Sequence, residues 1–188
     1  MKRMVTFIAS VLWLTALPAA RAESYTFTSL PLIAGGVNNA NQVVGLGVSG
    51  ETTYGLLYDH GALTTLFVPG SRDTVANGIN NLGQVVGYYV EPTGFQRGFV
   101  YGNGSFVSFA VPPGGGNIAP QGINDVGQII GYSGSFSFIY DGSTYRTLSV
   151  PGARSTNAYG LNNAGEVVGS YTDLSGCSHA STSTARAC

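Results

Sequence analysis

Short apolar runs alternate with turns rich in glycine and asparagine along most of the chain, and one such combination occurs four times. Each copy opens with a glycine, an aliphatic residue and an asparagine, and closes a few residues later with two β-branched aliphatic residues and a glycine. The copies span residues 36–45, 78–87, 122–131 and 160–169, so their closing glycines are 42, 44 and 38 residues apart. Self-similarity at a period of this size is typical of repeat architectures.

The second copy predicts the secondary structure of a whole unit. Apolar, β-branched and aromatic residues form four runs, which predict strands over 74–79, 84–89, 97–101 and 106–111. The turns between them contain Asn, Gly and Pro, which tolerate or preset the dihedral angles of tight reversals. Four strands in about 42 residues are typical of one blade of an antiparallel β-propeller. The sequence therefore predicts an all-β, propeller-like fold built from four-stranded antiparallel repeats.

Residues that recur at matching repeat positions are interpreted as structural. The first set holds the opening glycine, the first asparagine and the closing glycine of each copy: Gly36, Asn38, Gly45, Gly78, Asn80, Gly87, Gly122, Asn124, Gly131, Gly160, Asn162 and Gly169. The second set holds a third-strand tyrosine and the proline after the fourth strand: Tyr58, Pro69, Tyr101, Pro112, Tyr140 and Pro151. Each tyrosine precedes its proline by 11 residues, whereas the closing glycine precedes the tyrosine by 13, 14 and 9 residues, so most of the length variation lies in the loop between that glycine and the tyrosine.

The first residues predict a targeting segment. Lys2 and Arg3 precede an apolar run over 5–17, and Ala20-Arg21-Ala22 supplies a small-x-small cleavage pattern. We interpret residues 1–22 as a signal peptide cleaved after Ala22, because the apolar run is shorter than the ~20 residues that span a bilayer. The sequence thus predicts a secreted, extracellular protein with no membrane span in its mature chain.

Charge then argues against one class of partner. Without residues 1–22 the chain has no lysine and only five arginines, against nine Asp and Glu residues. A nucleic-acid backbone is bound by clustered basic side chains, which this composition does not provide. We therefore expect no nucleic-acid partner.

The two ends of the repeat region are irregular. We expect a β-repeat domain over 23–173, with three full units and a partial fourth, and an aberrant tail over 174–188 that is out of frame. Residues 25–31 resemble a fourth strand without its unit, and the tail lacks the aromatic third strand due near 178–183. In one explanation the N-terminal strand joins the last unit and closes a four-bladed ring. In the other, which the composition of the tail favours, the chain is a truncated or frame-shifted part of a longer repeat protein.

A family resemblance rests on the turn motif, on the Val-Pro-Gly that follows the fourth strand, and on the start of the third strand. That start reads Tyr54-Gly55-Leu56, Arg97-Gly98-Phe99 and Phe136-Ser137-Phe138 in the first three units. The fourth reads His179-Ala180, with Ser181 where phenylalanine is due. This pattern resembles the bacterial extracellular HAF repeats, named after His-Ala-Phe. The resemblance implies a secreted or surface protein with propeller-like repeats, and it provides no catalytic residues to carry over.

The asparagine-rich turns invite a calcium interpretation, because Asn and Asp oxygens are hard ligands. Only Asp125 supplies a carboxylate in any of the four turns. Turn geometry accounts for the asparagines without an ion. His60 and His179 have no partner at zinc-ligand spacing. We expect neither a metal nor a cofactor.

The remaining candidate residues are carboxylates and tyrosines that could act on or bind sugars, and the two cysteines of the tail. Carboxylates scatter over the turns at no common repeat position, so paired acids for glycoside hydrolysis stay an alternative only. Tyr54, Tyr88 and Tyr89, near the variable loop, are candidates for stacking on sugar rings, although aromatics that recur by repeat position more often pack in a core. Cys177 and Cys188 suggest a disulfide in an exported protein, or are accidental if the tail is out of frame, which we favour.

These patterns predict a secreted, non-catalytic structural or binding module of the bacterial cell surface or extracellular space, with polysaccharide or other surface components as partners. The alternatives are a propeller-type enzyme that acts on polysaccharide, and a self-associating matrix element that uses open sheet edges.

Overall fold

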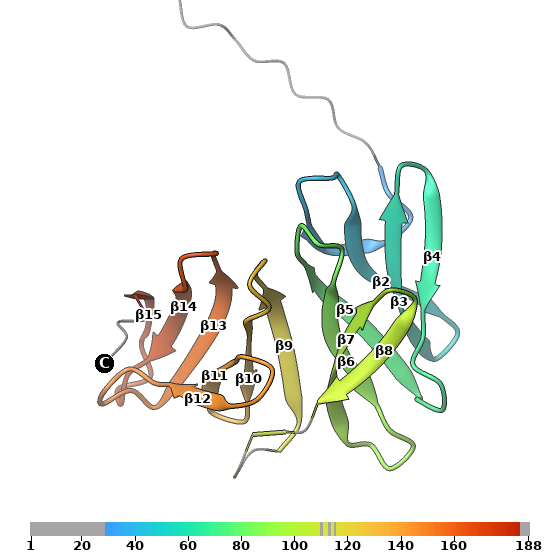
Figure 1. Ribbon diagram of the computed structural model, residues 1–188. Helices are drawn as coiled ribbons and strands as arrows, with labels where there is room; N and C mark the ends of the chain where they lie inside the picture. Colours follow the sequence, from blue (N-terminus) through green and yellow to red (C-terminus); the bar gives the residue numbers. More distant parts are fainter. Residues whose placement is uncertain (1–28, 110, 113, 115, 185–188) are drawn as a thin grey trace, which may run out of the picture.

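In this computed structural model the chain folds into antiparallel β-sheets (Figure 1). The structure describes residues 29–109, 111, 112, 114 and 116–184. The strands of the first two units are β1 (Ile33–Val37), β2 (Val43–Ser49), β3 (Thr52–Asp59), β4 (Ala62–Leu66), β5 (Asp73–Ile79), β6 (Val85–Val90), β7 (Gln96–Gly102) and β8 (Ser105–Phe109). Those of the last two are β9 (Ile118–Ile123), β10 (Ile129–Ser133), β11 (Phe136–Tyr140), β12 (Tyr145–Leu148), β13 (Ser155–Leu161), β14 (Glu166–Thr172) and β15 (Ser178–Thr184). Over the described ranges, no helix has the length and apolar character needed to cross a bilayer.

Each repeat forms its own sheet, with strands in sequence order. Three sheets have four strands, β1–β4, β5–β8 and β9–β12, and the last has three, β13–β15. All neighbouring strands pair antiparallel, as hairpin connections require. The four strands predicted for the second unit coincide with β5–β8 to within two residues at each end. The predicted all-β, four-stranded, propeller-like repeat is therefore confirmed.

The closing glycine of each unit is required by a close approach between the first two strands. In the second unit the pairing of β5 with β6 shifts register between Ala76 and Gly78, which brings the carbonyl of Val75 against Gly87. A Cβ on Gly87 would collide with that oxygen. The same collision, with the main chain of the first strand, would occur at the closing glycine of every other unit. Glycine recurs there because no side chain fits.

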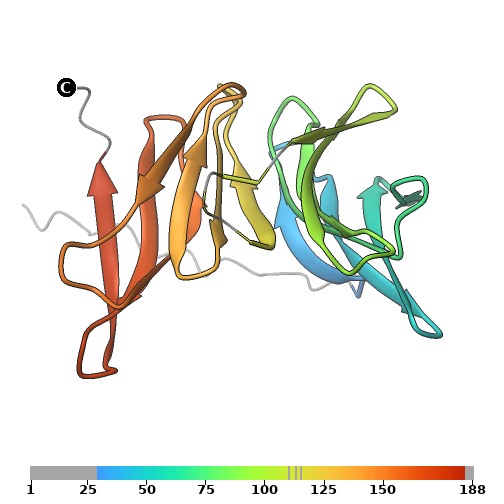
Figure 2. The same ribbon diagram turned by 90° about the horizontal axis from the view of Figure 1, so that it is seen from below.

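The sheets pack face to face in sequence order. Val44 of the first sheet is buried with Ala76, Ile79 and Val85 of the second, around Phe99. The next two interfaces repeat this arrangement, with Val86 and then Ile130 in the place of Val44. Figures 1 and 2 show the sheets as a row, with the first and last sheets at opposite ends. In the part of the chain that the structure describes, a packed interface joins neighbouring sheets, whereas the first and last sheets do not pack together.

The tail continues the repeat where the sequence predicts that its pattern is lost. Residues 178–184 form β15, which pairs with β14 over its whole length. Serine and threonine suffice because the ladder needs only main-chain groups and tolerates β-branched side chains well. The side chains of β15 differ from those of the corresponding strands β7 and β11 more than its backbone does. Ser181 pairs with Gly169, as Phe99 pairs with Gly87 and Phe138 with Gly131, so a hydroxymethyl group stands where two sheets bury a phenyl ring.

A cavity lies where that ring is missing. It has a volume of about 180 Å³ and is bordered by Leu148, Val150, Ala158, Val167 and Ser181. The preceding interfaces fill the corresponding space with Phe99 and Phe138, both fully buried. The interface between the third and fourth sheets is thus the least well filled of the three.

Several predictions fall outside the described residues. The signal peptide over 1–22, residues 25–28 of the predicted N-terminal strand, and Cys188 belong to this group. Residues 29–31, which end that predicted strand, are not in a strand, and Cys177 is exposed and not disulfide-bonded.

Candidate functional site: the asparagine turns

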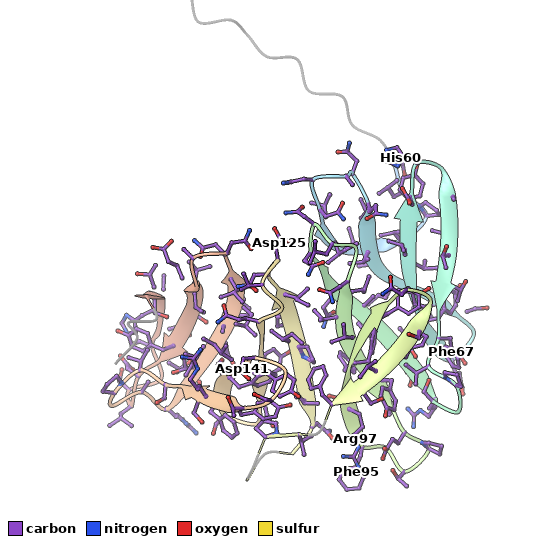
Figure 3. All side chains as sticks on the ribbon, in the orientation of Figure 1. His60, Phe67, Phe95, Arg97, Asp125 and Asp141 are labelled. Carbon is purple, nitrogen blue, oxygen red and sulfur yellow. The ribbon has the colours of Figure 1, made fainter. Side chains whose placement is uncertain are left out.

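The four asparagine turns gather at one end of the sheets. Together they border a shallow polar hollow of about 250 Å³, to which every unit contributes its aliphatic residue and its two turn residues. Figure 3 shows Asp125 on this end, next to the corresponding turn of the second sheet, whereas Asp141 lies on the outer part of the third sheet. All four units contribute side chains to this one surface pocket.

The side chain of the first asparagine of each turn makes several hydrogen bonds. In the second unit, Asn80 Oδ1 accepts from the main-chain N–H groups of Leu82 and Gln84, at 3.1 and 2.9 Å. Its Nδ2 donates to Gln84 Oε1 at 2.8 Å and to the carbonyl oxygen of Asn124, in the next unit, at 3.1 Å. Gly83, at φ +74°, lets the chain reverse within the loop. Asn80 is buried and its amide is fully used, which only asparagine or a close isostere achieves here.

These bonds join each unit to the next. Asn38 Nδ2 donates to the carbonyl of Asn80, and Asn124 Nδ2 donates to the carbonyl of Asn162, each at 3.1 Å. The motif therefore closes its own turn and links neighbouring sheets with one side chain. Among the residues that the structure describes, Asn162 ends the series, since its Nδ2 bonds only Glu166 Oε2 of its own turn, at 2.6 Å.

The second turn residue forms a parallel row on the rim of the hollow. The main-chain N–H of each unit donates to the side-chain oxygen of the next, from Asn39 to Asn81, from Asn81 to Asp125 and from Asp125 to Asn163, at 2.8–2.9 Å. Asp125 also accepts from the side-chain amides of Asn81 and Asn163. The Asn81 main-chain N–H, and then these two amides, lower the pKa of Asp125 below its ordinary range.

We expect Asp125→Asn to reduce the acid sensitivity of the fold. A carboxyl with a depressed pKa in the folded state stabilises that state above its unfolded pKa, near 4, and loses this contribution as the pH falls through the folded value. Asparagine keeps an acceptor for the Asn81 N–H, but carries no charge to lose. Thermal unfolding of both chains from pH 7 to pH 2 should give a flatter dependence for the variant. An equally steep acid loss in both chains would contradict this role for Asp125.

The three candidate tyrosines do not form one strip. Tyr54, on β3, lies against Gly47 of the neighbouring strand. Tyr88 and Tyr89 are consecutive on β6 and so point to opposite faces of the sheet. Tyr89 packs against the first core cluster, and its hydroxyl lies 3.2 Å from Ser108 Oγ. Burial, with smaller effects from Tyr132 and Asp73, raises the pKa of Tyr88.

Two of the carboxylates, Asp141 and Asp173, are held by hydrogen bonds from residues close to them in sequence. Asp141 accepts from the main-chain N–H groups and the hydroxyls of Thr144 and Ser143. Asp173 accepts chiefly from the Ser175 hydroxyl, lies 2.9 Å from His179 Nε2, and also accepts from the main-chain N–H groups of Cys177 and Ser175. Such bonds favour the charged form, and the pKa of each of the two lies well below its ordinary range. A general acid for glycoside hydrolysis needs the opposite shift. In the described part of the chain, no three His, Cys, Asp or Glu residues come together in a metal-binding group.

The turn glutamine has a structural role that the sequence did not predict. Gln42, Gln84 and Gln128 each accept from the first asparagine of their own turn, at 2.7–2.8 Å. The signal was present, because a glutamine or glutamate stands directly before the two aliphatic residues in every copy. Pairing between turns 38 to 44 residues apart had no such local signal.

Comparison with known proteins adds no family assignment, since no family model and no curated protein matches this chain.

Proposed function

We propose that the chain is a secreted, non-catalytic repeat module that binds polysaccharide outside a bacterial cell, and that it belongs with the HAF-like repeats its motifs resemble. The observation that carries the proposal is the hollow bordered by all four turns. Its rim offers neutral amides from Asn39, Asn81 and Asn163 beside the single carboxylate of Asp125. Amides that both donate and accept match the hydroxyl groups of sugars.

The non-catalytic part of the proposal rests on how the polar side chains are used. The first asparagine side chain of every turn is occupied within its own turn, those of the first three units also bond the next unit, and the carboxylates with shifted pKa values are held in the charged form. Hydrogen bonds produce these shifts, chiefly from His60 to Asp59, from Asn81 to Asp125, from Thr144 to Asp141 and from Ser175 to Asp173. This arrangement favours a rigid scaffold over acid–base chemistry.

Calorimetric titration with soluble oligosaccharides of cellulose, xylan, chitin and alginate tests the proposal. Asn39→Ala is the informative variant, because the Asn39 side chain is exposed on the rim and its main-chain bond to Asn81 survives the change. We expect a sugar that binds the unchanged chain to bind this variant about fivefold more weakly, the loss of one hydrogen bond.

Thr64→Ala, on the exposed outer strand β4, is the matched control and should bind like the unchanged chain. Absence of binding to all four sugars would remove the proposed ligand class. Release of new reducing ends during the titration would replace the proposal with the enzyme alternative.

A further inference from the structure

The last sheet leaves uncovered a position that every other sheet buries. Val44, Val86 and Ile130 are the second aliphatic residues of their copies, and each is 0% exposed against the next sheet. Val168 has the same position in the fourth copy and is 50% exposed. Tyr159, near it on β13, is exposed as well. We call this surface of Tyr159 and Val168, with the turn residues Asn162 and Asn163, the trailing face.

The first sheet has a complementary gap at its turn end, although Leu56, which stands in the position of Phe99, is 3% exposed and Leu32 lies beside its pairing partner Gly45. Ile79 and Ile123, the aliphatic residues of the second and third turns, are 8% and 9% exposed because the preceding sheet covers them. Val37 has this position in the first copy and is 65% exposed. Ala34, which pairs with Gly45 as Ala76 pairs with Gly87, is also exposed whereas Ala76 is buried. We call the surface of Ala34, Val37 and Val43, with Asn38 and Asn39, the leading face.

The hydrogen-bonding groups of the two faces are complementary, because the trailing face carries donors and the leading face carries acceptors. Between units, the first asparagine side chain and the second turn N–H always donate forward, to a main-chain carbonyl and to a side-chain oxygen of the following unit. The trailing face therefore ends in two forward donors, Asn162 Nδ2 and the Asn163 N–H. The leading face begins with the two corresponding acceptors, the Asn38 carbonyl and Asn39 Oδ1.

We propose that two copies of the chain associate head to tail, with the trailing face of one copy packed on the leading face of the other. The interface repeats, between chains, the contact that already joins neighbouring sheets three times within one chain. It places Val168 of one copy against Val37 and Val43 of the second, as Val86 lies with Ile123 and Ile129. Apolar burial supplies the driving force, and the asparagine bonds fix the register.

A second copy is the occupant because the faces of one chain do not meet. The first and last sheets lie at opposite ends of the row (Figures 1 and 2) and form no packed interface among the described residues. The contact is heterologous, so it closes into a ring or extends into a chain according to the rotation between copies. This association does not depend on the proposed sugar ligand.

Sedimentation velocity of the purified full chain over a wide concentration range tests the inference. We expect a concentration-dependent assembly of at least two copies, and Val168→Asp should weaken it at least about tenfold by burying a charge in the interface. Val107→Asp is the matched control, because Val107 is equally apolar and exposed but lies on β8, outside both faces. A strictly monomeric unchanged chain would overturn the inference.

Mixing two variants tests the head-to-tail sense directly. Val37→Asp blocks only the leading face and Val168→Asp only the trailing face, so each should be monomeric alone. Mixed in equal amounts, they should form a 1:1 complex through the one intact pair of faces. Circular dichroism confirms that both variants are folded. Persistence of dimers in either single variant, or failure of the folded pair to associate, would refute the arrangement.

Discussion

Asn80→Asp is expected to lower the free energy of unfolding by roughly 3–5 kcal/mol, the usual cost of an uncompensated charge in a buried site. Asn80 is buried, and its Nδ2 donates to Gln84 Oε1 and to the Asn124 carbonyl. Aspartate has no hydrogen to donate at neutral pH and turns both contacts into repulsions. The Gln84 amide can rotate to offer its nitrogen, but the Asn124 carbonyl stays an acceptor. Urea unfolding at pH 7 measures the loss.

Asn103→Asp provides the control for Asn80→Asp. It makes the same chemical change on an exposed hairpin where the φ of Asn103 is +51°, a conformation that aspartate also tolerates. Its effect should stay within about 0.5 kcal/mol, as for most surface substitutions. Equal losses in the two variants would show that the bonds between the turns contribute little. The cost of Asn80→Asp should also shrink as the pH falls toward 3, where the new carboxyl is protonated in both states.

Ser181→Phe is expected to raise the free energy of unfolding by about 1.5–3 kcal/mol, the gain from burying one phenylalanine side chain. The cavity of about 180 Å³ beside Ser181 stands where the preceding interfaces hold Phe99 and Phe138. The backbone of β15 already has the register of those strands, so the ring enters without a change of pairing. For a chain of this size such a gain corresponds to a rise in melting temperature of roughly 3–12 °C.

Two further variants serve as comparisons for Ser181→Phe. Ala180→Phe adds the same ring at an exposed neighbouring position and should leave the melting temperature nearly unchanged. Phe138→Ser makes the reverse change in the third sheet and should cost about 3–5 kcal/mol, as large-to-small core substitutions do. A melting temperature lowered by Ser181→Phe would mean that the walls formed by Leu148 and Val167 cannot accept a ring.

The strands themselves were predictable, because their signals are local. Alternating β-branched and aromatic residues between Asn-Gly turns gave the strands of the second unit to within two residues of β5–β8. The tail was less predictable. Its serines and threonines carry no core pattern, yet β15 forms because β14 offers an unpaired ladder of main-chain groups. The candidate tyrosines show a further limit, since adjacent residues such as Tyr88 and Tyr89 lie on opposite faces of a strand.

The sequence by itself determined the period, the strand composition and the positions where only glycine or asparagine serves. These properties follow from backbone sterics and hydrogen bonding within a few residues, as in the Asn80 turn. The tertiary structure alone decided that the four turns join in one row and border a common hollow, because those contacts link residues about forty positions apart. It alone decided, too, that Val168 is exposed while Val44, Val86 and Ile130 are buried. Four identical local patterns acquire different environments because burial depends on which sheet has a neighbour, and that is a property of the stack rather than of the repeat.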